Sequence, residues 1–242
     1  WDHYFPIALA YALDIVDIRY DAIVVDEGQD FGEEYWLPIE MLLKDGSTSP
    51  LYIFHDENQD VYARASSFPG DASPITLSFN CRNTKKIHQA AYLYYNGPTI
   101  SPPDLIGDDI ETLAAPDLSS QAKKIQEFVS KLITVEKIPN SSIAVLIADR
   151  VKRKSYESVL ERLPLPSGLH WGSVNSTDGR TVTLESVARF KGLESQVIIL
   201  WGLDDLPSQD KQGTLYVGTS RAKSILAVCG KEETCSSVLN GT

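Results

Sequence analysis

The sequence of 242 residues predicts an α/β fold in which helices cover both faces of a parallel sheet. Two observations lead to this class. Short apolar runs with the length of strands alternate with longer segments in which apolar residues recur with the period of a helix. Several of these runs, such as residues 143–147 and 197–201, are apolar throughout, which is typical of strands buried on both faces of a parallel sheet.

The first part of the chain predicts an incomplete α/β unit. Residues 1–18 have the pattern of the end of a helical region, and because the chain opens at Trp1 we interpret it as a piece of a longer protein. Residues 22–26 and 51–54 are predicted strands, and acidic residues follow both. A helix is predicted over residues 33–43, and Gly46 and Ser47 interrupt the chain before the second strand.

The remainder predicts a more complete unit of the same kind. We place the boundary between a first domain at residues 1–74 and a second at residues 75–242. Residues 96–120 are rich in Pro, Gly and Asp without a regular period, so we predict a linker or a reduced insertion there. The predicted strands are residues 75–79, 143–147, 181–185, 197–201 and 225–229, and the predicted helices are residues 84–94, 121–132, 154–163 and 214–222.

Composition limits the classes of function. No segment approaches the roughly 20 apolar residues of a membrane-spanning helix, and the amino terminus lacks the features of a secretory signal, so we expect a cytoplasmic protein with no membrane partner. Cys81, Cys229 and Cys235 form no metal-ligand motif and are expected to be reduced. The net charge of -11 argues against a broad phosphate-binding surface, although one local groove of basic residues would suffice for nucleic acid.

An acidic pair, Asp26 and Glu27, follows the first predicted strand. Open α/β sheets bind ligands at the carboxyl ends of their strands. An Asp in that position can hold a nucleotide-bound Mg²⁺, and a neighbouring Glu can polarise an attacking water. The same two residues could instead form an acidic loop that caps a helix, because Asp and Glu are favoured before helix starts.

Five segments of the chain form an ordered set of motifs. They are D-E-G-Q-D at residues 26–30, I-F-H-D-E-N-Q-D-V-Y at residues 53–62, N-C-R-N-T-K at residues 80–85, residues 183–194, which end in R-F-K-G-L-E, and L-Y-V-G-T-S-R-A at residues 215–222. This set resembles motifs II to VI of the UvrD/Rep-like superfamily-one DNA helicases. The resemblance implies the RecA-like fold of P-loop NTPases, with a truncated first RecA-like unit that carries Walker B and motif III and a nearly complete second one.

For the first domain, the resemblance implies ATP and Mg²⁺ as cofactors of the intact protein. Asp26 would coordinate Mg²⁺, Glu27 would activate the attacking water, and Gln59 would sense the terminal phosphate. These roles suit the chemistry of carboxylate and amide side chains at a nucleotide phosphate.

For the second domain, the resemblance assigns Arg82 and Arg221 as arginine fingers that stabilise charge on the transferring phosphoryl group. Glu194 would accept hydrogen bonds from the ribose, and Gly192 would let the backbone approach closely. Each residue also has a purely structural interpretation. Arg82 could form a surface salt bridge, Arg221 could cap the helix that it ends, and Glu194 could be a solvated charge before a strand.

The resemblance also implies contacts with nucleic acid from Tyr62, Arg64, Arg150, Ser186 and Arg189. The expected partner is single-stranded or partly duplex DNA, with RNA as the alternative. Basic residues near Arg150 could bind phosphates, but they could equally be the solvated start of a helix.

The chain departs from the family pattern at several points. It contains no G-x-x-x-x-G-K-[ST] loop, whose amides and lysine would hold the phosphates. Ala188 replaces the histidine usual before K-G-L-E, and the order Tyr62-Ala-Arg64-Ala65 departs from the usual aromatic and arginine after motif III. Residues 83–180 are also too few for the large inserted helical domain of the best-known members.

The leading hypothesis is therefore the motor portion of an ATP-dependent helicase or translocase, which hydrolyses ATP in the intact parent and not by itself. The missing amino-terminal region of the same polypeptide would be a partner, and an exposed sheet edge could allow self-association. The alternative is a non-enzymatic, degenerate helicase-like module that binds nucleic acid or protein. A nucleotide kinase is disfavoured, because such enzymes lack the paired N-x-R and Y-V-G-x-S-R elements.

Overall fold

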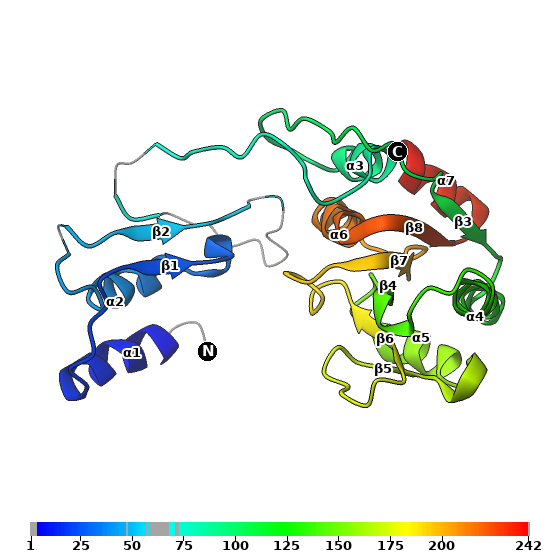
Figure 1. Ribbon diagram of the computed structural model, residues 1–242, viewed down its shortest axis with the longest axis horizontal. Helices are drawn as coiled ribbons and strands as arrows, with labels where there is room; N and C mark the ends of the chain where they lie inside the picture. The colour runs from blue at the N-terminus through cyan, green and yellow to red at the C-terminus, as the bar shows by residue number, and fades with distance from the viewer. Residues whose placement is uncertain (1–3, 47, 57, 59–67, 71–72, 242) are drawn as a thin grey trace. The chain divides into compact units, whose positions relative to one another are not determined.

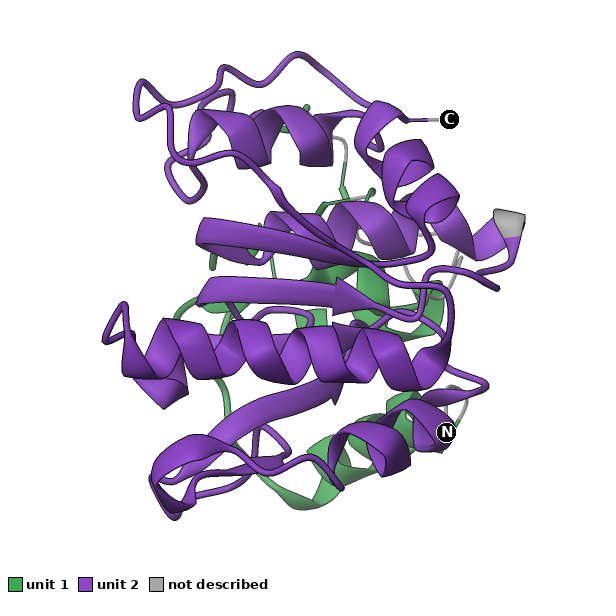
Figure 2. Cartoon of the chain, turned by 90° about the vertical axis from the view of Figure 1, so that its right-hand side faces the viewer, with its two compact units in different colours: residues 1–75 green, residues 76–242 purple. Residues whose placement is uncertain are grey.

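A computed structural model describes residues 4–46, 48–56, 58, 68–70 and 73–241 of the chain. The chain divides into two compact units, Trp1–Ile75 and Thr76–Thr242, which Figure 2 shows in different colours. We describe each unit by itself. Among the described residues, no helix combines the length and apolar character needed to cross a membrane.

Unit 1 contains a small parallel sheet. Its regular elements are α1 (Tyr4–Ile15), β1 (Ile23–Val25), α2 (Trp36–Glu40) and β2 (Leu51–Ile53), with 3-10 turns at Gly28–Asp30 and Glu33–Tyr35. Strands β1 and β2 are parallel, with Ile23 opposite Leu51. The core of this unit forms where Val25 packs with Trp36 and Ile39 of α2.

Two expectations for unit 1 are wrong in detail. The strand at residues 22–26 was expected to be buried on both faces, but Val24 remains 64% exposed, because its face of the two-stranded sheet has no covering helix within the unit. The helix expected over residues 33–43 is interrupted. A 3-10 turn occupies Glu33–Tyr35 and α2 ends at Glu40, and Pro38 within this stretch lacks the amide that a longer helix would use.

Unit 2 is built on a six-stranded sheet in the order β3-β8-β7-β4-β6-β5 (Figure 1). Every pairing in it is parallel. The strands are β3 (Glu111–Ala114), β4 (Ile143–Ile147), β5 (His170–Gly172), β6 (Thr181–Ser186), β7 (Ser195–Trp201) and β8 (Ala222–Gly230). The helices are α3 (Lys85–Tyr92), α4 (Leu118–Thr134), α5 (Arg153–Leu160), α6 (Ser208–Ser220) and α7 (Glu232–Asn240).

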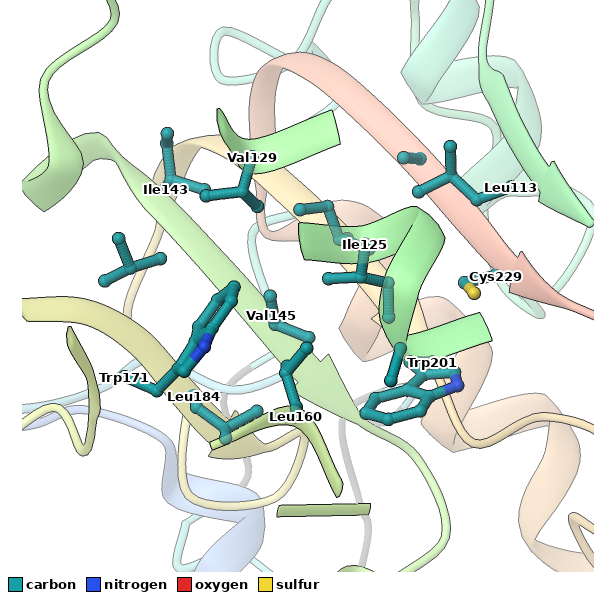
Figure 3. Close-up of a cluster of buried hydrophobic side chains, with 14 of the residues drawn as sticks. Leu113, Ile125, Val129, Ile143, Val145, Leu160, Trp171, Leu184, Trp201 and Cys229 are labelled. Carbon is teal, nitrogen blue, oxygen red and sulfur yellow. The ribbon is translucent and has the colours of Figure 1, made fainter. Parts of the chain in front are cut away.

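Helices cover both faces of this sheet. On one face, Ile125 and Val129 of α4 and Leu160 of α5 pack on Val145 and Leu184, as Figure 3 shows. On the other face lies α6. There a Cβ added to Gly218 would stand only 2.7 Å from the Leu200 side chain, so the absence of a side chain lets α6 approach β7. The predicted α/β class with a parallel sheet and two helical layers is confirmed.

The segment before α3 differs from the expectation. Residues 75–79 were expected to form a strand, but they form only an isolated bridge between Phe79 and Ser101. The side chains of Ile75 and Leu77 are exposed. A strand needs a neighbour that pairs with its amides and carbonyls along its length, and no such neighbour lies beside this segment among the described residues.

Residues 96–120 are not only a linker. They contain β3, which pairs with β8 and forms one edge of the sheet, and the first turn of α4. Asp117 caps α4, because its side chain accepts a hydrogen bond from the amide of Ser120. The sequence signal for β3 is weak because Glu111 and Thr112 are exposed and only Leu113 of its apolar residues is buried.

Two further elements were not predicted, β5 and α7. Strand β5 has three residues at the sheet edge, of which Trp171 is buried. Helix α7 ends at Asn240 and is followed by Gly241, whose φ of 71° lies in the left-handed region that favours glycine after a helix. Strand β5 has only three residues, and α7 contains few apolar residues among polar ones, so neither shows a clear apolar period.

The packing of α4 on the sheet should dominate the stability of unit 2. Ile125 is fully buried between α4 and the strands. We expect Ile125→Ala to lower the free energy of unfolding by about 2–5 kcal/mol, because it removes buried apolar contacts and leaves a cavity. Urea denaturation followed by circular dichroism measures this change. Val135→Ala, at an exposed residue after the same helix, should change stability by less than about 0.5 kcal/mol, and equal effects of the two would contradict this packing.

Candidate functional site

Two residues from separate motifs stand side by side at the amino ends of two neighbouring strands. Glu194 directly precedes β7, and Arg221 directly precedes β8. These strands pair in parallel with Ser195 opposite Ala222, and the Ser195 amide donates to the Arg221 carbonyl at 3.1 Å. The R-F-K-G-L-E and L-Y-V-G-T-S-R-A motifs therefore meet at the end of the sheet of unit 2 where strands β7 and β8 begin. We call this end the first edge.

A third motif joins them through an ion pair. The Arg82 Nε donates to Glu194 Oε2 at 2.9 Å, although the two residues are 112 positions apart in the chain. Lys223 of β8 forms a second ion pair with Glu194 Oε1. All three side chains are partly exposed, so this cluster is open to solvent and to a ligand.

The two cations keep Glu194 ionised. The Lys223 ammonium, which donates a hydrogen bond to Glu194, holds the pKa of that carboxyl below its usual range, and Arg82 adds to the effect. An ionised carboxylate accepts hydrogen bonds and donates none. Glu194 is therefore suited to accept from hydroxyl groups, and Arg82 and Lys223 are suited to bind an anion next to it.

Asparagine side chains fix the Arg82 segment against the sheet. Asn83 is buried, and its Nδ2 donates to the carbonyls of Ser220 at 2.9 Å and Ala222 at 2.5 Å. The Asn80 Oδ1 accepts from the Arg82 amide at 2.9 Å, which closes the turn. Asn83 thus ties this turn to the junction of α6 and β8, so the position of Arg82 relative to Arg221 is set by hydrogen bonds within unit 2.

Arg221 is almost entirely buried, with 1% of its surface exposed. Its Nε donates to the Val217 carbonyl at 3.2 Å, its Nη1 to the Leu193 carbonyl at 3.4 Å, and its Nη2 to the Ser220 hydroxyl at 3.2 Å. The Val217 carbonyl belongs to the last turn of α6, where the carbonyls lack backbone partners within the helix, and the Leu193 carbonyl belongs to the segment before β7. In this arrangement the guanidinium caps α6 and does not face solvent.

Gly192 lies in the segment between β6 and β7 and has a φ of 77°. A residue with a Cβ adopts this left-handed conformation only with strain. Glycine therefore lets the chain turn just before Glu194, whatever ligand approaches it.

Three of the predicted nucleic-acid residues lie at the opposite end of the sheet, where strands β4 and β6 end. We call this end the second edge. Arg150 follows the carboxyl end of β4, and Ser186 ends β6. These strands pair with Ile147 opposite Ser186, and the Ser186 hydroxyl accepts from the Arg189 amide at 3.4 Å. Because β7 spans seven residues, at about 3.3 Å each, the two edges lie about 20 Å apart.

A buried acid that sequence reasoning missed lies at this second edge. The Glu185 side chain has no exposed surface and pairs with Arg153 Nη2 at 2.8 Å and with Arg189 Nη1 at 3.5 Å. Its Oε1 also accepts the Ser186 amide at 2.9 Å. Glu185 thus links the start of α5 to the segment after β6.

The acidic pair of unit 1 lies at the end of β1. Asp26 is exposed and accepts the Glu27 amide at 2.9 Å. Glu27 has a left-handed φ of 52°, and its carboxylate accepts from Gln29 Nε2 at 2.5 Å. Gln29 in turn accepts the Asp56 amide at 3.0 Å, so the turns that follow β1 and β2 are joined.

Three predicted site residues, Gln59, Tyr62 and Arg64, lie outside the described residues. Across the part of the chain that is described, no group of three or more His, Cys, Asp or Glu side chains could hold a metal ion. A nucleotide-bound Mg²⁺ does not need such a group, since one or two carboxylates with water and phosphate oxygens complete its coordination. The exposed Asp26 carboxylate meets that requirement.

Sequence reasoning missed Asn83, Lys223 and Glu185 for different reasons. Asn83 lies within a motif and Lys223 directly follows one, but the sequence does not show which residues they contact. Glu185 lies at the end of a predicted strand, residues 181–185, where threonines alternate with apolar residues. A charge at the end of such a strand was the available signal.

Comparisons with known proteins show limited similarity. No family model matches the chain, and no curated protein matches it. A solved structure titled as the C-terminal domain of a possible DNA helicase from Lactobacillus plantarum is similar over 65% of this chain and 91% of that one, with 16% identity and a TM-score of 0.48. A similarity of this degree gives no information on the activity of the present chain.

The hydrogen bonds of Asn83 make it a test of the geometry at the first edge. We expect Asn83→Ala to destabilise unit 2 by about 2 kcal/mol, because two buried carbonyls lose a donor. Thermal and urea unfolding measure this effect. Cys81→Ala, at an exposed thiol in the same turn, is the control and should leave stability nearly unchanged. An Asn83 variant as stable as the Cys81 variant would contradict the assigned hydrogen bonds.

Proposed function

We propose that this chain is the motor portion of an ATP-dependent, superfamily-one DNA or RNA helicase or translocase. In the intact protein Asp26 and Glu27 of unit 1 and Arg82, Gly192, Glu194 and Arg221 of unit 2 would take part in nucleotide binding and hydrolysis. A Walker A loop would come from another part of the same polypeptide, since the chain contains none. The proposal includes Gln59 as the sensor of the terminal phosphate.

The observation that supports this proposal most is the meeting of three motifs at one edge of unit 2. Arg82, Glu194 and Arg221 are far apart in sequence, yet Arg82 contacts Glu194, and Arg221 contacts the residue on either side of Glu194. Three unrelated surface charges would not be expected to share one site. Cations beside an ionised acceptor are the groups that the phosphates and ribose of a nucleotide require.

ATP with Mg²⁺ would supply the phosphoryl group and the charge that neutralises its oxygens. The residues of this chain would then orient and stabilise it. Asp26 would hold the metal through its exposed carboxylate, and Glu27 would accept a proton from the attacking water. Arg82 would leave Glu194 for the phosphate, and Glu194 would accept from the ribose hydroxyl groups.

At the opposite edge, Arg150, Ser186 and Arg189 would bind the backbone of single-stranded nucleic acid. Tyr62 and Arg64 of unit 1 complete this part of the proposal. A guanidinium and a hydroxyl at the ends of adjacent parallel strands suit contacts with phosphate oxygens, which position a nucleic acid without reading its sequence.

The burial of Arg221 supports a second candidate, a non-enzymatic helicase-like module. A guanidinium that already donates to Val217, Leu193 and Ser220 has a structural task, and an arginine finger must reach the phosphate. Under the motor proposal, Arg221 exchanges part of this network for the nucleotide. Under the alternative, it remains a cap. A G-K-[ST] loop encoded upstream of Trp1 in the natural gene favours the motor, and a gene that begins near Trp1 favours the module.

The nucleotide site is tested with the chain joined to its natural upstream region. We expect phosphate release from ATP that single-stranded DNA stimulates, and a loss of kcat of about 100-fold or more in Arg82→Ala, because an arginine finger contributes at least that much. Arg162→Ala, at an exposed arginine after α5, should retain wild-type kcat. The 242-residue chain alone should release no phosphate. An intact protein without ATPase activity, or Arg82→Ala at full activity, would refute the motor proposal.

The nucleic-acid site is tested with the 242-residue chain and fluorescein-labelled oligothymidine, by fluorescence anisotropy. We expect affinity to fall as salt rises, and Arg189→Ala to reduce the slope of log K against log salt by about 0.7, the value for one lost phosphate contact on a single strand. Arg162→Ala, which also removes one positive charge, should leave the slope unchanged. Equal slopes for all three proteins would place the contact elsewhere.

A further inference from the structure

We infer that Glu185 is a positioning residue, which holds the Arg189 and Arg153 guanidinium groups in the orientation needed to bind a nucleic-acid phosphate. This inference rests on the proposed nucleic-acid site and adds to it a residue of the fourth motif to which the family resemblance assigns no role. The unusual feature is a carboxylate without exposed surface directly beside two arginines at the carboxyl end of β6.

The burial of the Glu185 carboxylate requires compensating contacts. An ionised side chain removed from water is costly unless cations and hydrogen-bond donors compensate it. Glu185 Oε1 has both, since it accepts the Ser186 amide and lies 2.8 Å from Arg153 Nη2. Its Oε2 is buried and accepts no hydrogen bond from the described part of the chain. Among the described residues, Arg189 Nη1 forms an ion pair with that oxygen at 3.5 Å.

The two arginines come from different elements. Arg153 begins α5 and is also held by Glu157 Oε1 at 2.5 Å. Arg189 lies in the segment after β6, and 52% of its side chain is exposed. Glu185 Oε2 therefore lies within ion-pair distance of Arg189 Nη1, while about half of the Arg189 side chain is open to solvent. A planar guanidinium can bind a carboxylate with one edge and a phosphate with the other.

Ser186 connects Glu185 and its two arginines to the proposed nucleic-acid contact surface. Its amide donates to Glu185, and its hydroxyl accepts from the Arg189 amide. The Glu185 carboxylate thus orders both the side chain of Arg189 and the turn that carries it. Without the Glu185 carboxylate, Arg189 would keep its charge but lose its fixed orientation. Nucleic-acid binding would then cost the entropy of ordering a long side chain.

The two possible roles of Glu185 predict opposite changes in nucleic-acid affinity when its charge is removed. Removal of a negative charge beside a phosphate site should strengthen nucleic-acid binding if Glu185 only offsets the arginines. If Glu185 orients them, its neutralisation should weaken binding in spite of the more positive surface. The sign of the change in affinity therefore separates the two explanations.

The experiment measures the affinity of the 242-residue chain for fluorescein-labelled oligothymidine at fixed salt. We expect Glu185→Gln to weaken binding about fivefold to tenfold, because Arg189 would lose the charge that holds its guanidinium and binding would have to order it. Glu161→Gln is the matched control, since it removes the same charge from an exposed residue just after α5 and should leave binding unchanged or slightly tighter. Tighter binding by Glu185→Gln overturns the inference.

A double variant shows whether the effect passes through Arg189. In the Arg189→Ala background, Glu185→Gln should change affinity by less than about twofold, because the group it positions is gone. An equal loss in both backgrounds would indicate a general disturbance of the fold and overturn the inference. Circular dichroism and thermal unfolding establish that each variant is folded.

Arg189→Lys provides a test that does not depend on the folding of the Glu185 variant, because Arg189 is half exposed. It keeps the charge and loses the planar fork, so its affinity should lie within about twofold of Arg189→Ala. A lysine variant with wild-type affinity overturns the inference. If the wild-type chain itself does not bind, the proposed nucleic-acid site fails together with the inference. If Arg189→Ala weakens binding and Glu185→Gln does not, only the inference fails.

Discussion

All strands of the larger sheet run in one direction, and this constraint separates the two candidate sites. A chain that leaves the carboxyl end of β6 must return to the other edge before β7 can begin. Residues 187–194 make this return, with Val187 and Phe190 buried on the way. The R-F-K-G-L-E motif therefore has its arginine with Glu185 at one edge and its glutamate with Arg82 at the other. A single short segment touches both places where the motifs predict ligands.

Contacts at both edges hold the ends of this return segment, residues 187–194. The return segment is held at one end by Glu185 and at the other by the carbonyl of Leu193, which accepts from Arg221. Gly192, with its left-handed φ of 77°, lies where the segment can turn. A change in the partners of Glu194 or Arg221 would act on the same short stretch of backbone that orders Arg189.

The sequence predicted the class of the fold because buried parallel strands leave an unmistakable apolar signal, as residues 143–147 and 197–201 do. It failed where an element depends on its neighbours. Residues 75–79 look like a strand but form only one isolated bridge, between Phe79 and Ser101, and β3 is a strand whose outer residues are polar because it lies at an edge. For the site, motif order brought Arg82 and Glu194 to attention, and the structure places them in contact. The partners Asn83, Lys223 and Glu185 could not be predicted, because each acts through a residue distant in sequence or through burial.

The net charge of -11, which argues against a broad phosphate-binding surface, belongs to unit 1. Residues 1–75 contain 3 Lys or Arg and 15 Asp or Glu, whereas residues 76–242 contain 19 and 18, so unit 2 is nearly neutral. In unit 2 the cations at both edges have carboxylate partners: Arg82 and Lys223 share Glu194, Arg153 lies between Glu157 and Glu185, and Lys152 pairs with Asp205 at 2.7 Å. Acidic residues here hold basic ones in defined directions, so a nearly neutral surface carries oriented cations. Long-range attraction of a polyanion would be weak for such a surface. Binding would then depend on a few placed contacts, whose geometry matters more than their number.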